Sequence, residues 1–197
     1  PVHYAGVACE MDAILRVSQS SNITVIADNA QGIKSTYKDK DLSSFGELVA
    51  LSFHETKNII SGEGGALLIN QEAFIGAAEM IREKGTDRAK FYRGEVDKYS
   101  WRSLGSSYLP NEVTAAFLKA QLDIADIITQ KRIDAWNAYY NFLKDAEKKG
   151  LLSRPIVPNH CGHNGHIFYV LLNKNLDRSS IIARLKERGV GAVSHYV

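Results

Sequence analysis

The chain has 197 residues, of which 45% are hydrophobic and 23% are charged, and its formal net charge is +2. This length and composition suffice to bury a hydrophobic core in one large or two small domains. Basic residues are spread along the chain, and no apolar run approaches the roughly 18 residues that cross a bilayer, which argues against nucleic-acid-binding and membrane-spanning proteins.

The two cysteines and the two chain ends suggest where the protein works and how much of it is present. Cys9 and Cys161 are too few for a disulfide framework and fit a reducing, cytoplasmic location. The end segments PVHYAG and GVGAVSHYV resemble the interior of structured segments rather than polar chain ends. We therefore expect a fragment of a longer cytoplasmic protein.

Helix and strand patterns alternate in the first part of the chain. Apolar residues recur at helical spacing in two stretches, and three other stretches are β-rich or continuously apolar. The helices are expected at residues 11–21 and 72–85, the second ended by Gly85, and the strands at residues 23–28, 48–53 and 64–70. This order predicts an α/β layer architecture in which much of the sheet is parallel.

The remainder of the chain is predicted as a long loop, a long helical run and a β-α-β tail. Residues 83–109 are polar, charged and aromatic, and a connection of this length is usually functional or mobile. The helical pattern after Pro110 is long enough that we expect a break before Gly150. The tail is expected to form a strand at 167–172, a helix at 177–189 with Asp177 or Ser179 near its N-cap, and a strand at 190–197.

Three features of the α/β part are weak signals when they are taken singly. Asp28 follows an apolar strand, where open α/β sheets bind ligands, but capping of a turn explains it about twice as well. Lys57 follows another buried strand and could form a Schiff base, although a loop lysine is catalytic in only about one case in twenty. The glycines Gly62, Gly64 and Gly65 allow close approach of the backbone to a ligand without matching a phosphate-loop motif.

Taken together, the order of these motifs resembles that of a known family. The segments that carry the resemblance are VIADNAQG, SFGELVALSFHETKN, GEGGALLIN, GSSYLPNEVTAAFLKAQL, HIFYVLL and SHYV. They are similar to the DegT/DnrJ/EryC1/StrS family of pyridoxal-phosphate-dependent sugar aminotransferases, and most similar to members that aminate a TDP-linked 4-keto-6-deoxyhexose. The similarity covers essentially the whole chain.

The resemblance implies an α/β fold of the aspartate-aminotransferase type, which is the type I fold of PLP-dependent transferases. Residues 1–110 would be part of the large PLP-binding domain, residues 111–150 a connecting helical region, and residues 151–197 the start of the small C-terminal domain. The upstream portion of the large domain and the end of the small domain would lie outside this chain.

The cofactor of the family is pyridoxal 5′-phosphate, and the resemblance implies a role for five residues. Asp28 would pair with the pyridinium nitrogen, Ala30 would pack on one ring face, and Gln31 would bond near the phenolic oxygen. Ser52 would hold the cofactor phosphate. Lys57 would hold the cofactor as a Schiff base and then move protons between substrate and cofactor.

The implied reaction moves an amino group from an amino acid, with L-glutamate as the expected donor, to the 4-keto group of a nucleotide-linked 6-deoxyhexose. Such a product would serve surface-polysaccharide or amino-sugar biosynthesis. The implied assembly is a homodimer with shared active sites, without nucleic acid or membrane as partner. Where many relatives carry an asparagine that reaches the partner subunit's cofactor phosphate, this chain has Ser107, a shorter donor.

The histidine-rich stretch HCGHNGH, residues 160–166, holds four possible zinc ligands. Four ligands so tightly spaced give a metal only about one chance in ten, and we predict none. His166 instead matches a position just before a family strand. It is expected to line the substrate pocket together with His195 and Tyr196 of the closing motif.

Other charged side chains near these motifs have no assigned role. His54 and Glu55, beside Lys57, could face the donor or the substrate, but a structural histidine explains the first at least as well. The arginines and lysines from Arg82 to Arg102 could meet the substrate's diphosphate, although a solvated charged loop is the default.

Two other functions are compatible with part of this pattern. A PLP-dependent sugar dehydratase uses the same cofactor, but relatives with that chemistry carry histidine in place of the lysine, and Lys57 is present. The second alternative is a catalytically inactive fragment that acts as a dimerising or binding module. The joint presence of Asp28, Ser52 and Lys57 argues that the parent protein is an enzyme.

Overall fold

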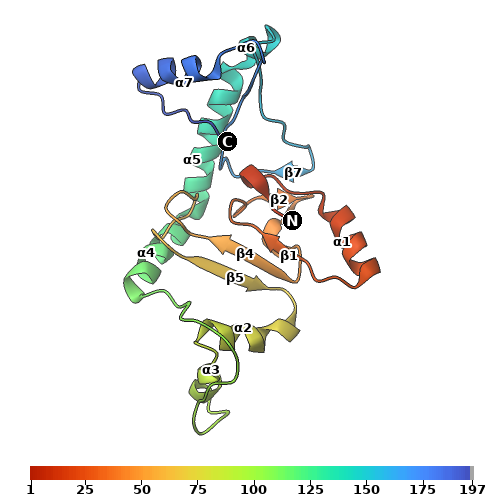
Figure 1. The fold of residues 1–197 in the computed structure, drawn as a ribbon, viewed down its shortest axis with the longest axis vertical. Helices are drawn as coiled ribbons and strands as arrows, with labels where there is room; N and C mark the ends of the chain where they lie inside the picture. Colours follow the sequence, from red (N-terminus) through yellow and green to blue (C-terminus); the bar gives the residue numbers. More distant parts are fainter. Residues whose placement is uncertain (196–197) are drawn as a thin grey trace. The chain divides into compact units, whose positions relative to one another are not determined.

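The computed structural model describes residues 1–195, which form two compact units (Figure 1). The first unit combines Pro1–Asp134 with Val157–Ile167, and the second combines Ala135–Ile156 with the chain from residue 168 onward. The chain therefore leaves the first unit, returns to it and leaves it again. The domain limits expected near residues 110 and 150 remain predictions.

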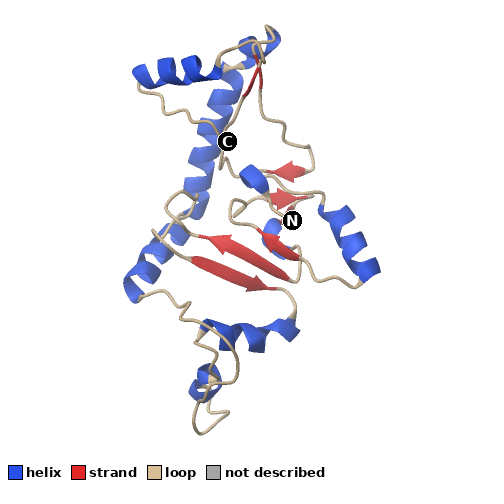
Figure 2. Cartoon of the chain, in the orientation of Figure 1, coloured by secondary structure: helices blue, strands red, loops and turns tan. Residues whose placement is uncertain are grey.

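Helices and short strands alternate along the chain (Figure 2). The helices are α1 (Met11–Ser21), α2 (Ile75–Arg82), α3 (Arg88–Tyr92), α4 (Glu112–Asp123), α5 (Ala125–Phe142), α6 (Lys144–Lys148) and α7 (Arg178–Glu187). The strands are β1 (Ile26–Asp28), β2 (Thr36–Tyr37), β3 (Lys40–Asp41), β4 (Leu48–Ser52), β5 (Gly65–Ile69), β6 (Leu152–Ser153), β7 (Cys161–Gly162) and β8 (Leu171–Leu172). Short 3₁₀ helices are η1 (Tyr4–Gly6), η2 (Leu42–Ser44) and η3 (Glu72–Phe74). Within residues 1–195, no helix is both long and apolar enough to cross a membrane.

The central sheet of the first unit consists of β1, β4 and β5, in that order (Figure 1). β1 and β4 are parallel, with Asp28 opposite Ala50, whereas β4 and β5 are antiparallel, with Ser52 opposite Gly65. The expectation that much of the sheet is parallel therefore holds for the first pair only. Residues 53–64 connect β4 to β5 without a crossover helix, and a strand that returns directly runs antiparallel.

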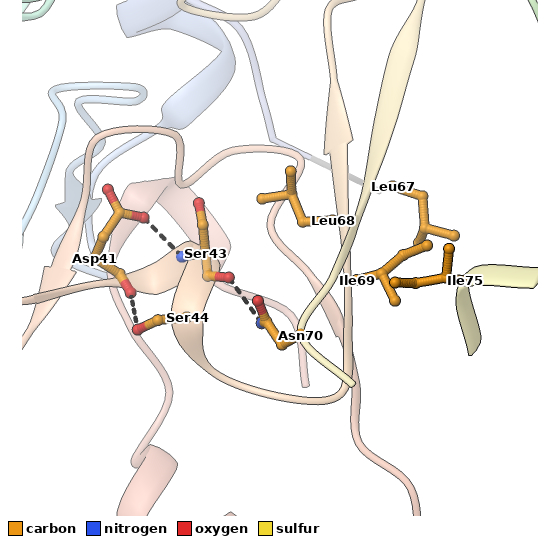
Figure 3. A pocket seen from close by; sticks show the side chains of 8 residues that line it. All are labelled: Asp41, Ser43, Ser44, Leu67, Leu68, Ile69, Asn70 and Ile75. Atoms are coloured by element: carbon orange, nitrogen blue, oxygen red, sulfur yellow. Dashed lines mark hydrogen bonds between the residues drawn. The ribbon is translucent and has the colours of Figure 1, made fainter. Parts of the chain in front are cut away.

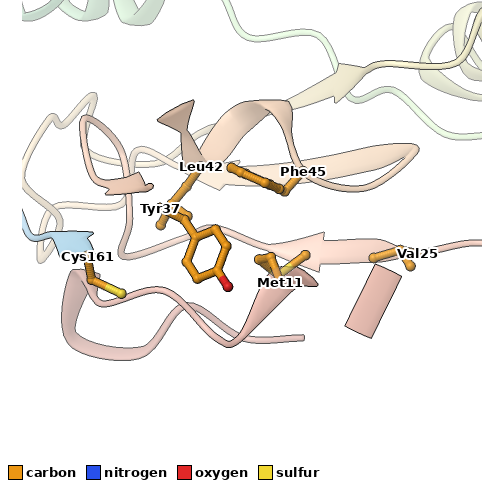
Figure 4. Packing of buried hydrophobic residues seen from close by; sticks show 6 residues of the cluster. All are labelled: Met11, Val25, Tyr37, Leu42, Phe45 and Cys161. Carbon is orange, nitrogen blue, oxygen red and sulfur yellow. The ribbon is translucent and has the colours of Figure 1, made fainter. Parts of the chain in front are cut away.

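A hydrophobic core of the first unit joins α1 to the small sheet in which β2 pairs with β3 and β7 (Figure 4). The buried Tyr37 ring meets Phe45 edge to face, with 5.5 Å between ring centroids, and its hydroxyl donates to Glu10 at 3.2 Å. α1 forms where predicted because its apolar face, led by the fully buried Met11, packs into this core. Each fully buried side chain of this size contributes about 1.5–3 kcal/mol.

The long helical run after Pro110 is interrupted, as expected from its length. The interruptions lie at Ile124, between α4 and α5, and at Leu143, between α5 and α6. α4 begins after Asn111, whose side-chain oxygen accepts a hydrogen bond from the Thr114 N–H at 2.9 Å. α5 contributes its first part to the first unit and the remainder to the second.

The second unit is organised around aromatic side chains of α5. Trp136 stacks on Tyr140 with 5.0 Å between ring centroids and meets Phe168 edge to face at 5.3 Å. Arg154 lies 3.9 Å from the Tyr140 ring centroid and pairs with Glu147 at 2.6 Å. β6 and β8 form a short antiparallel pair in the same unit.

The tail agrees with the prediction in its helix and differs in its strands. α7 begins after Asp177, whose carboxylate accepts a hydrogen bond from the Ser179 N–H at 3.0 Å. The strand expected at residues 167–172 is confirmed only for Leu171–Leu172, which form β8. Residues 190–195 form no strand, so the strand expected at 190–197 is wrong for these residues, and residues 196–197 lie outside the described part of the chain. Backbone groups of a strand need partners, and the pairing of β8 with β6 covers two residues only.

Residues 83–109, expected as a long loop, contain the short helix α3, and polar contacts close the segment. The buried Asp87 accepts hydrogen bonds from the Ser100 N–H at 2.7 Å and from Arg102 Nε at 2.6 Å. The Ser100 N–H, followed by Arg102, holds the pKa of Asp87 below its usual range. A backbone bridge between Thr86 and Trp101 lies beside these contacts, so the two arms of the loop are tied together.

Candidate active site

The carboxyl ends of β1 and β4 meet at one edge of the central sheet. Asp28 is the last residue of β1 and Ser52 is the last residue of β4, and the parallel register pairs Asp28 with Ala50. Gly65, the first residue of β5, lies opposite Ser52. The fold thus brings a carboxylate, a hydroxyl and the end of a glycine-rich turn to the edge where open α/β sheets bind ligands.

Lys57 lies on the loop between β4 and β5, and this loop is anchored on both sides of it. The buried side chains of Phe53 and Ile59 belong to a hydrophobic cluster with Ala125 of α5. The Lys57 N–H donates to the His54 carbonyl oxygen at 2.9 Å. The Lys57 carbonyl oxygen accepts a hydrogen bond from Arg132 Nη2 at 3.3 Å, so the backbone at Lys57 is held in one position.

The turn that leads into β5 requires glycine at two positions. Gly64 has a φ of +154°, which L side chains rarely adopt. A Cβ on Gly65 would lie 2.8 Å from the Leu51 carbonyl oxygen. A larger residue at Gly65 would therefore push β5 away from β4 beside Ser52.

Asp28 and Gln31 each have one polar atom engaged within the chain. Asp28 Oδ1 accepts a hydrogen bond from the Ala30 N–H at 3.0 Å, which is the turn-capping contact considered from the sequence. The Asp28 carboxylate is exposed and has a second oxygen, so capping and ligand binding are compatible. Gln31 Oε1 accepts from the Ala5 N–H at 2.7 Å, which leaves its amide NH₂ as the group for a ligand.

A buried polar cluster joins the segment 157–167 to the loop between β4 and β5. Asn58 is buried, donates from Nδ2 to the Asn164 carbonyl oxygen at 2.9 Å, and contacts His166 Nδ1 through Oδ1 at 2.8 Å. Asn164 is fully buried, and its amide donates to the carbonyl oxygens of Gln31 and Ile33 at 2.8 and 2.9 Å. The cluster therefore links His166 to two segments. Asn164 connects it to the residues that follow β1, and Asn58 connects it to the loop that follows β4.

His166 is neutral at pH 7. Its pKa is lowered to about 4, first by burial and then by the positive charges of Lys57 and Arg132. Asn58, which contacts His166 Nδ1 at 2.8 Å, directly follows Lys57, so His166 lies beside the loop that carries Lys57. The structure thus brings His166, expected from the sequence to line the substrate pocket, together with Lys57.

The structure does not test the roles expected for three other residues. Ser107 is exposed and forms a backbone bridge with Glu83 in the loop at residues 83–109. His195 belongs to the second unit. Tyr196 lies outside the described residues. Their roles remain predictions.

Two other residues of the HCGHNGH stretch, His160 and Cys161, pack in the core of the first unit. His160 Nε2 contacts Glu10 Oε1 at 2.8 Å, and its ring meets Tyr37 edge to face. Cys161 is buried in the hydrophobic core, where burial raises the pKa of its thiol. Among residues 1–195, no group of three or more histidine, cysteine, aspartate or glutamate side chains is arranged to hold a metal ion. His54 contacts Thr56 Oγ1 at 2.9 Å and so supports its own loop.

Asn58, Arg132 and Asn164 are site residues that sequence patterns do not identify. Asn58 lies between Lys57 and two apolar residues, and this position is the one sequence signal that it could be a buried polar residue. The structure shows that Asn58 is buried. Asn164 lies in the HCGHNGH stretch, where the histidines and the cysteine suggest a metal site and nothing marks the asparagine as a buried hydrogen-bonding residue. Arg132 is 75 residues from Lys57, and no local pattern predicts their contact.

A separate hollow of about 600 Å³ lies beside β5 (Figure 3). Its lining residues are Asp41, Ser43, Ser44, Leu67, Leu68, Ile69, Asn70 and Ile75. Hydrogen bonds from the Ser43 N–H to Asp41 Oδ1 and from Asn70 Nδ2 to the Ser43 carbonyl oxygen close its polar side. None of the predicted site residues lines this hollow, so it is distinct from the sheet edge.

Comparison with known proteins finds one family over the whole chain. The family model described as the DegT/DnrJ/EryC1/StrS aminotransferase family matches residues 1–197. An uncharacterised protein of Methanocaldococcus jannaschii is 30% identical over 203 residues, covering 100% of this chain and 52% of that protein. UDP-4-amino-4,6-dideoxy-N-acetyl-beta-L-altrosamine transaminase of Helicobacter pylori is 26% identical and covers 99% of this chain and 50% of its own length. GDP-perosamine synthase of Caulobacter vibrioides is 28% identical, with 96% and 49% covered. The chain therefore spans about half the length of the curated relatives it matches.

Solved structures match the fold closely. Helicobacter pylori PseC, an aminotransferase involved in the biosynthesis of pseudoaminic acid, has a TM-score of 0.87 at 24% identity and covers 100% of this chain and 51% of its own. An aminotransferase of Psychrobacter cryohalolentis has a TM-score of 0.85 at 28% identity, with 96% and 52% covered. A candidate sugar aminotransferase of Streptococcus pneumoniae, in its PLP form, has a TM-score of 0.82 at 20% identity, with 100% and 53% covered. These likenesses confirm the predicted α/β fold class, the type I fold of PLP-dependent transferases.

Proposed function

Because the chain belongs to the DegT/DnrJ/EryC1/StrS aminotransferase family, we propose that its protein transfers an amino group from an amino acid to a nucleotide-linked 4-keto-6-deoxyhexose, with Lys57 as the catalytic residue. One observation carries the proposal. Asp28 and Ser52 end neighbouring parallel strands, and the anchored Lys57 loop follows directly after Ser52.

Pyridoxal 5′-phosphate is the cofactor of this family, and the chemistry of the residues at the sheet edge fits it. Asp28 offers a carboxylate for the ring nitrogen, and Gln31 offers its amide NH₂ for the phenolic oxygen. Ser52 offers a hydroxyl for the phosphate, and Lys57 offers an amine for the carbonyl carbon. When bound, the cofactor supplies an electron sink that stabilises negative charge on the carbon that loses a proton.

In the proposed mechanism, Lys57 accepts and returns the proton that moves between substrate and cofactor. Proton transfer by a positioned side chain contributes about 10²–10⁴-fold to rate. Arg132 and the buried Phe53 and Ile59 hold the backbone of Lys57, which limits the region that its amine can reach. With the cofactor bound, the exposed Asp28 carboxylate would favour the protonated form of the ring nitrogen.

The substrate class rests on relatives and on sequence motifs. Two relatives are named for UDP-linked and GDP-linked amino sugars, and the first of these names specifies a 4-amino-4,6-dideoxy sugar. These names support a nucleotide-linked 4-keto-6-deoxyhexose as the amino acceptor. TDP as the nucleotide, L-glutamate as the donor, and a product used in surface-polysaccharide or amino-sugar biosynthesis are proposals from the motif resemblance.

We further propose a cytoplasmic homodimer in which each active site is shared between two subunits. Ser107 would supply its hydroxyl to the cofactor phosphate held by the partner. Large apolar side chains that flank Ser107 are exposed in the single chain, among them Trp101, Leu104 and Val113. Exposed apolar side chains gathered in one stretch support a contact surface there.

The proposed role of Lys57 is tested by reductive trapping. The protein that carries this chain is mixed with pyridoxal 5′-phosphate, reduced with borohydride and analysed by peptide mass spectrometry. A single pyridoxyl adduct at Lys57 is expected, and Lys57→Arg is expected to lose both the adduct and at least about 10²-fold in kcat.

Lys119→Arg is the matched control for this experiment. Lys119 lies exposed on α4 and pairs with Asp123 at 2.8 Å, so its replacement leaves the Lys57 adduct in place. Labelling scattered over surface lysines, or an adduct that persists in Lys57→Arg, contradicts the proposed function.

A further inference from the structure

The amide of Asn58 can take only one orientation in the polar cluster. Its Nδ2 lies 2.9 Å from the Asn164 carbonyl oxygen, which accepts hydrogen bonds and cannot donate them. Asn58 Oδ1 must therefore be the atom that faces His166 Nδ1 at 2.8 Å. An amide oxygen only accepts, so Nδ1 of His166 carries the proton of this hydrogen bond.

The tautomer of His166 follows from this contact. The imidazole is neutral at pH 7, since its pKa is lowered to about 4, and a neutral ring has one protonated nitrogen. With the proton on Nδ1, Nε2 carries a lone pair. Within residues 1–195, no hydrogen-bond partner of this Nε2 is found.

The segment that carries His166 is held rigidly. The His166 N–H donates to Asn164 Oδ1 at 3.1 Å, and the Asn164 amide is bonded to two backbone carbonyl oxygens. Gly165 has a φ of +65°, and a Cβ there would lie 2.8 Å from the backbone carbon of Arg132. The backbone that carries His166 is therefore fixed, and the contact of Nδ1 with Asn58 holds the ring itself.

We propose that Asn58 is a positioning residue that locks His166 in the Nδ1–H tautomer, so that Nε2 accepts a hydrogen bond from a sugar hydroxyl of the amino acceptor beside Lys57. The inference rests on the proposed function and names the group through which the same site would orient its substrate.

Such an acceptor discriminates between groups on one hexose. A neutral Nε2 lone pair bonds a hydroxyl, which can donate, and is repelled by the oxygen of a keto group, which cannot. A sugar turned in the site would place its carbonyl against Nε2 and lose this bond. The pair Asn58 and His166 would thereby favour the orientation that presents the keto carbon to the amine.

The tautomer can be measured without cofactor or turnover. Nitrogen-15 NMR of the imidazole groups, with His166 assigned by its loss in His166→Asn, reports the protonation of each ring nitrogen. At pH 7 we expect a protonated Nδ1 and an unprotonated Nε2, and Asn58→Leu, which removes the acceptor, is expected to yield a mixture of tautomers. A protonated Nε2 in the unchanged protein overturns the inference, as does an Asn58→Leu spectrum identical to that of the unchanged protein.

A matched pair of substitutions tests the hydroxyl contact. In His166→Asn, the side-chain amide can replace Nδ1–H toward Asn58, while nothing replaces Nε2. In His166→Gln, the longer side chain can carry an oxygen to the place of Nε2. We expect KM for the nucleotide sugar to rise about tenfold in His166→Asn and to recover at least partly in His166→Gln, with a smaller change in KM for the amino donor.

The outcomes separate this inference from the proposed function. Equal increases of KM for both substrates in His166→Asn indicate a structural role and overturn the inference, and so does an unchanged KM for the sugar. If the Lys57 adduct forms while either result is found, the proposed function stands and only the role of His166 fails. If no adduct forms, the proposed function fails even where the NMR spectrum shows the expected tautomer.

Discussion

Three polar residues near Lys57 hold different parts of the candidate active site in place. Arg132 binds the backbone of Lys57, whereas Asn58 and Asn164 bind His166 and the segment that carries it. Burial makes the neutral form of His166 the stable one, with the charges of Lys57 and Arg132 acting in the same direction. A group kept neutral in the folded state makes stability depend on pH.

The acid sensitivity of the protein is predicted from His166. Its pKa is about 4 in the folded protein, against an ordinary value of 6.5, so unfolding takes up a proton between these pH values. Stability therefore falls as pH decreases through this window. At pH 5 we expect His166 to cost about 1 kcal/mol, after allowance for its partial solvent exposure.

His3 and His163, whose pKa values are also lowered by burial, add to the same acid sensitivity. The difference between the unchanged protein and His166→Asn isolates the share of His166. Urea unfolding at pH 7 and pH 5 measures it, and an equal loss of stability in both proteins contradicts the prediction.

Among the structural elements, α5 is the support of the site. It packs Ala125 against Phe53 and Ile59, and its Arg132 reaches the Lys57 carbonyl oxygen. The segment 157–167 approaches the same helix at Gly165, where backbone meets backbone. The loop that carries Lys57 and the segment that carries His166 are therefore positioned by contacts with one helix.

Gly165→Ala is predicted to disturb this contact, and Gly94→Ala is its matched control. Both glycines have φ near +70° (+65° and +73°), but a Cβ on Gly165 would lie 2.8 Å from Arg132 backbone, whereas a Cβ on Gly94 would meet nothing within 4 Å. Gly94→Ala is expected to cost about 1–2 kcal/mol from the left-handed conformation alone.

Gly165→Ala is expected to cost roughly 1–3 kcal/mol more than Gly94→Ala, because the backbones must also separate. Chemical denaturation of the two variants provides the comparison. Equal destabilisation would show that the close approach to α5 has no energetic effect.

At the scale of the whole molecule, large apolar side chains near Ser107 are exposed to solvent, and no contact within the described chain covers them. Leu104 is 94% exposed, Val113 is 81% exposed and Trp101 is 79% exposed. Burying apolar surface of this size against a second copy is favourable by about 25 cal/mol per Å². The proposed homodimer would cover these side chains and bring Ser107 to the partner's site.

Leu104→Glu is predicted to weaken the dimer. A carboxylate at an apolar interface would be desolvated without a partner, and we expect the dissociation constant to rise at least about tenfold. Ile156→Glu, at a position 83% exposed in the second unit, is the control and is expected to leave the molecular mass unchanged. Light scattering across a concentration series measures both. A protein that is monomeric before substitution, or a dimer unaffected by Leu104→Glu, contradicts the proposal.

The spacing of apolar residues, the composition of the strands and the capping residues of the helices determined much of the local structure. α1 spans the predicted residues because its apolar spacing matches a helix that buries one face, and Asp177 caps α7 as its side-chain chemistry indicates. β4 was predictable from a continuous apolar run. The motif order around Asp28, Ser52 and Lys57 also pointed to the family that the comparison then showed.

Tertiary structure alone decided the direction of β5, the missing strand at residues 190–195, and the polar cluster around Lys57. Strand direction and strand extent depend on which backbone is available for pairing, and a local sequence does not contain that partner. Asn58 and His166 are separated by 108 residues and meet because α5 and the sheet edge hold their segments in contact. Local sequence therefore specified the chemistry of Lys57 and its neighbours along the chain, while long-range packing selected the side chains that set the protonation state of His166.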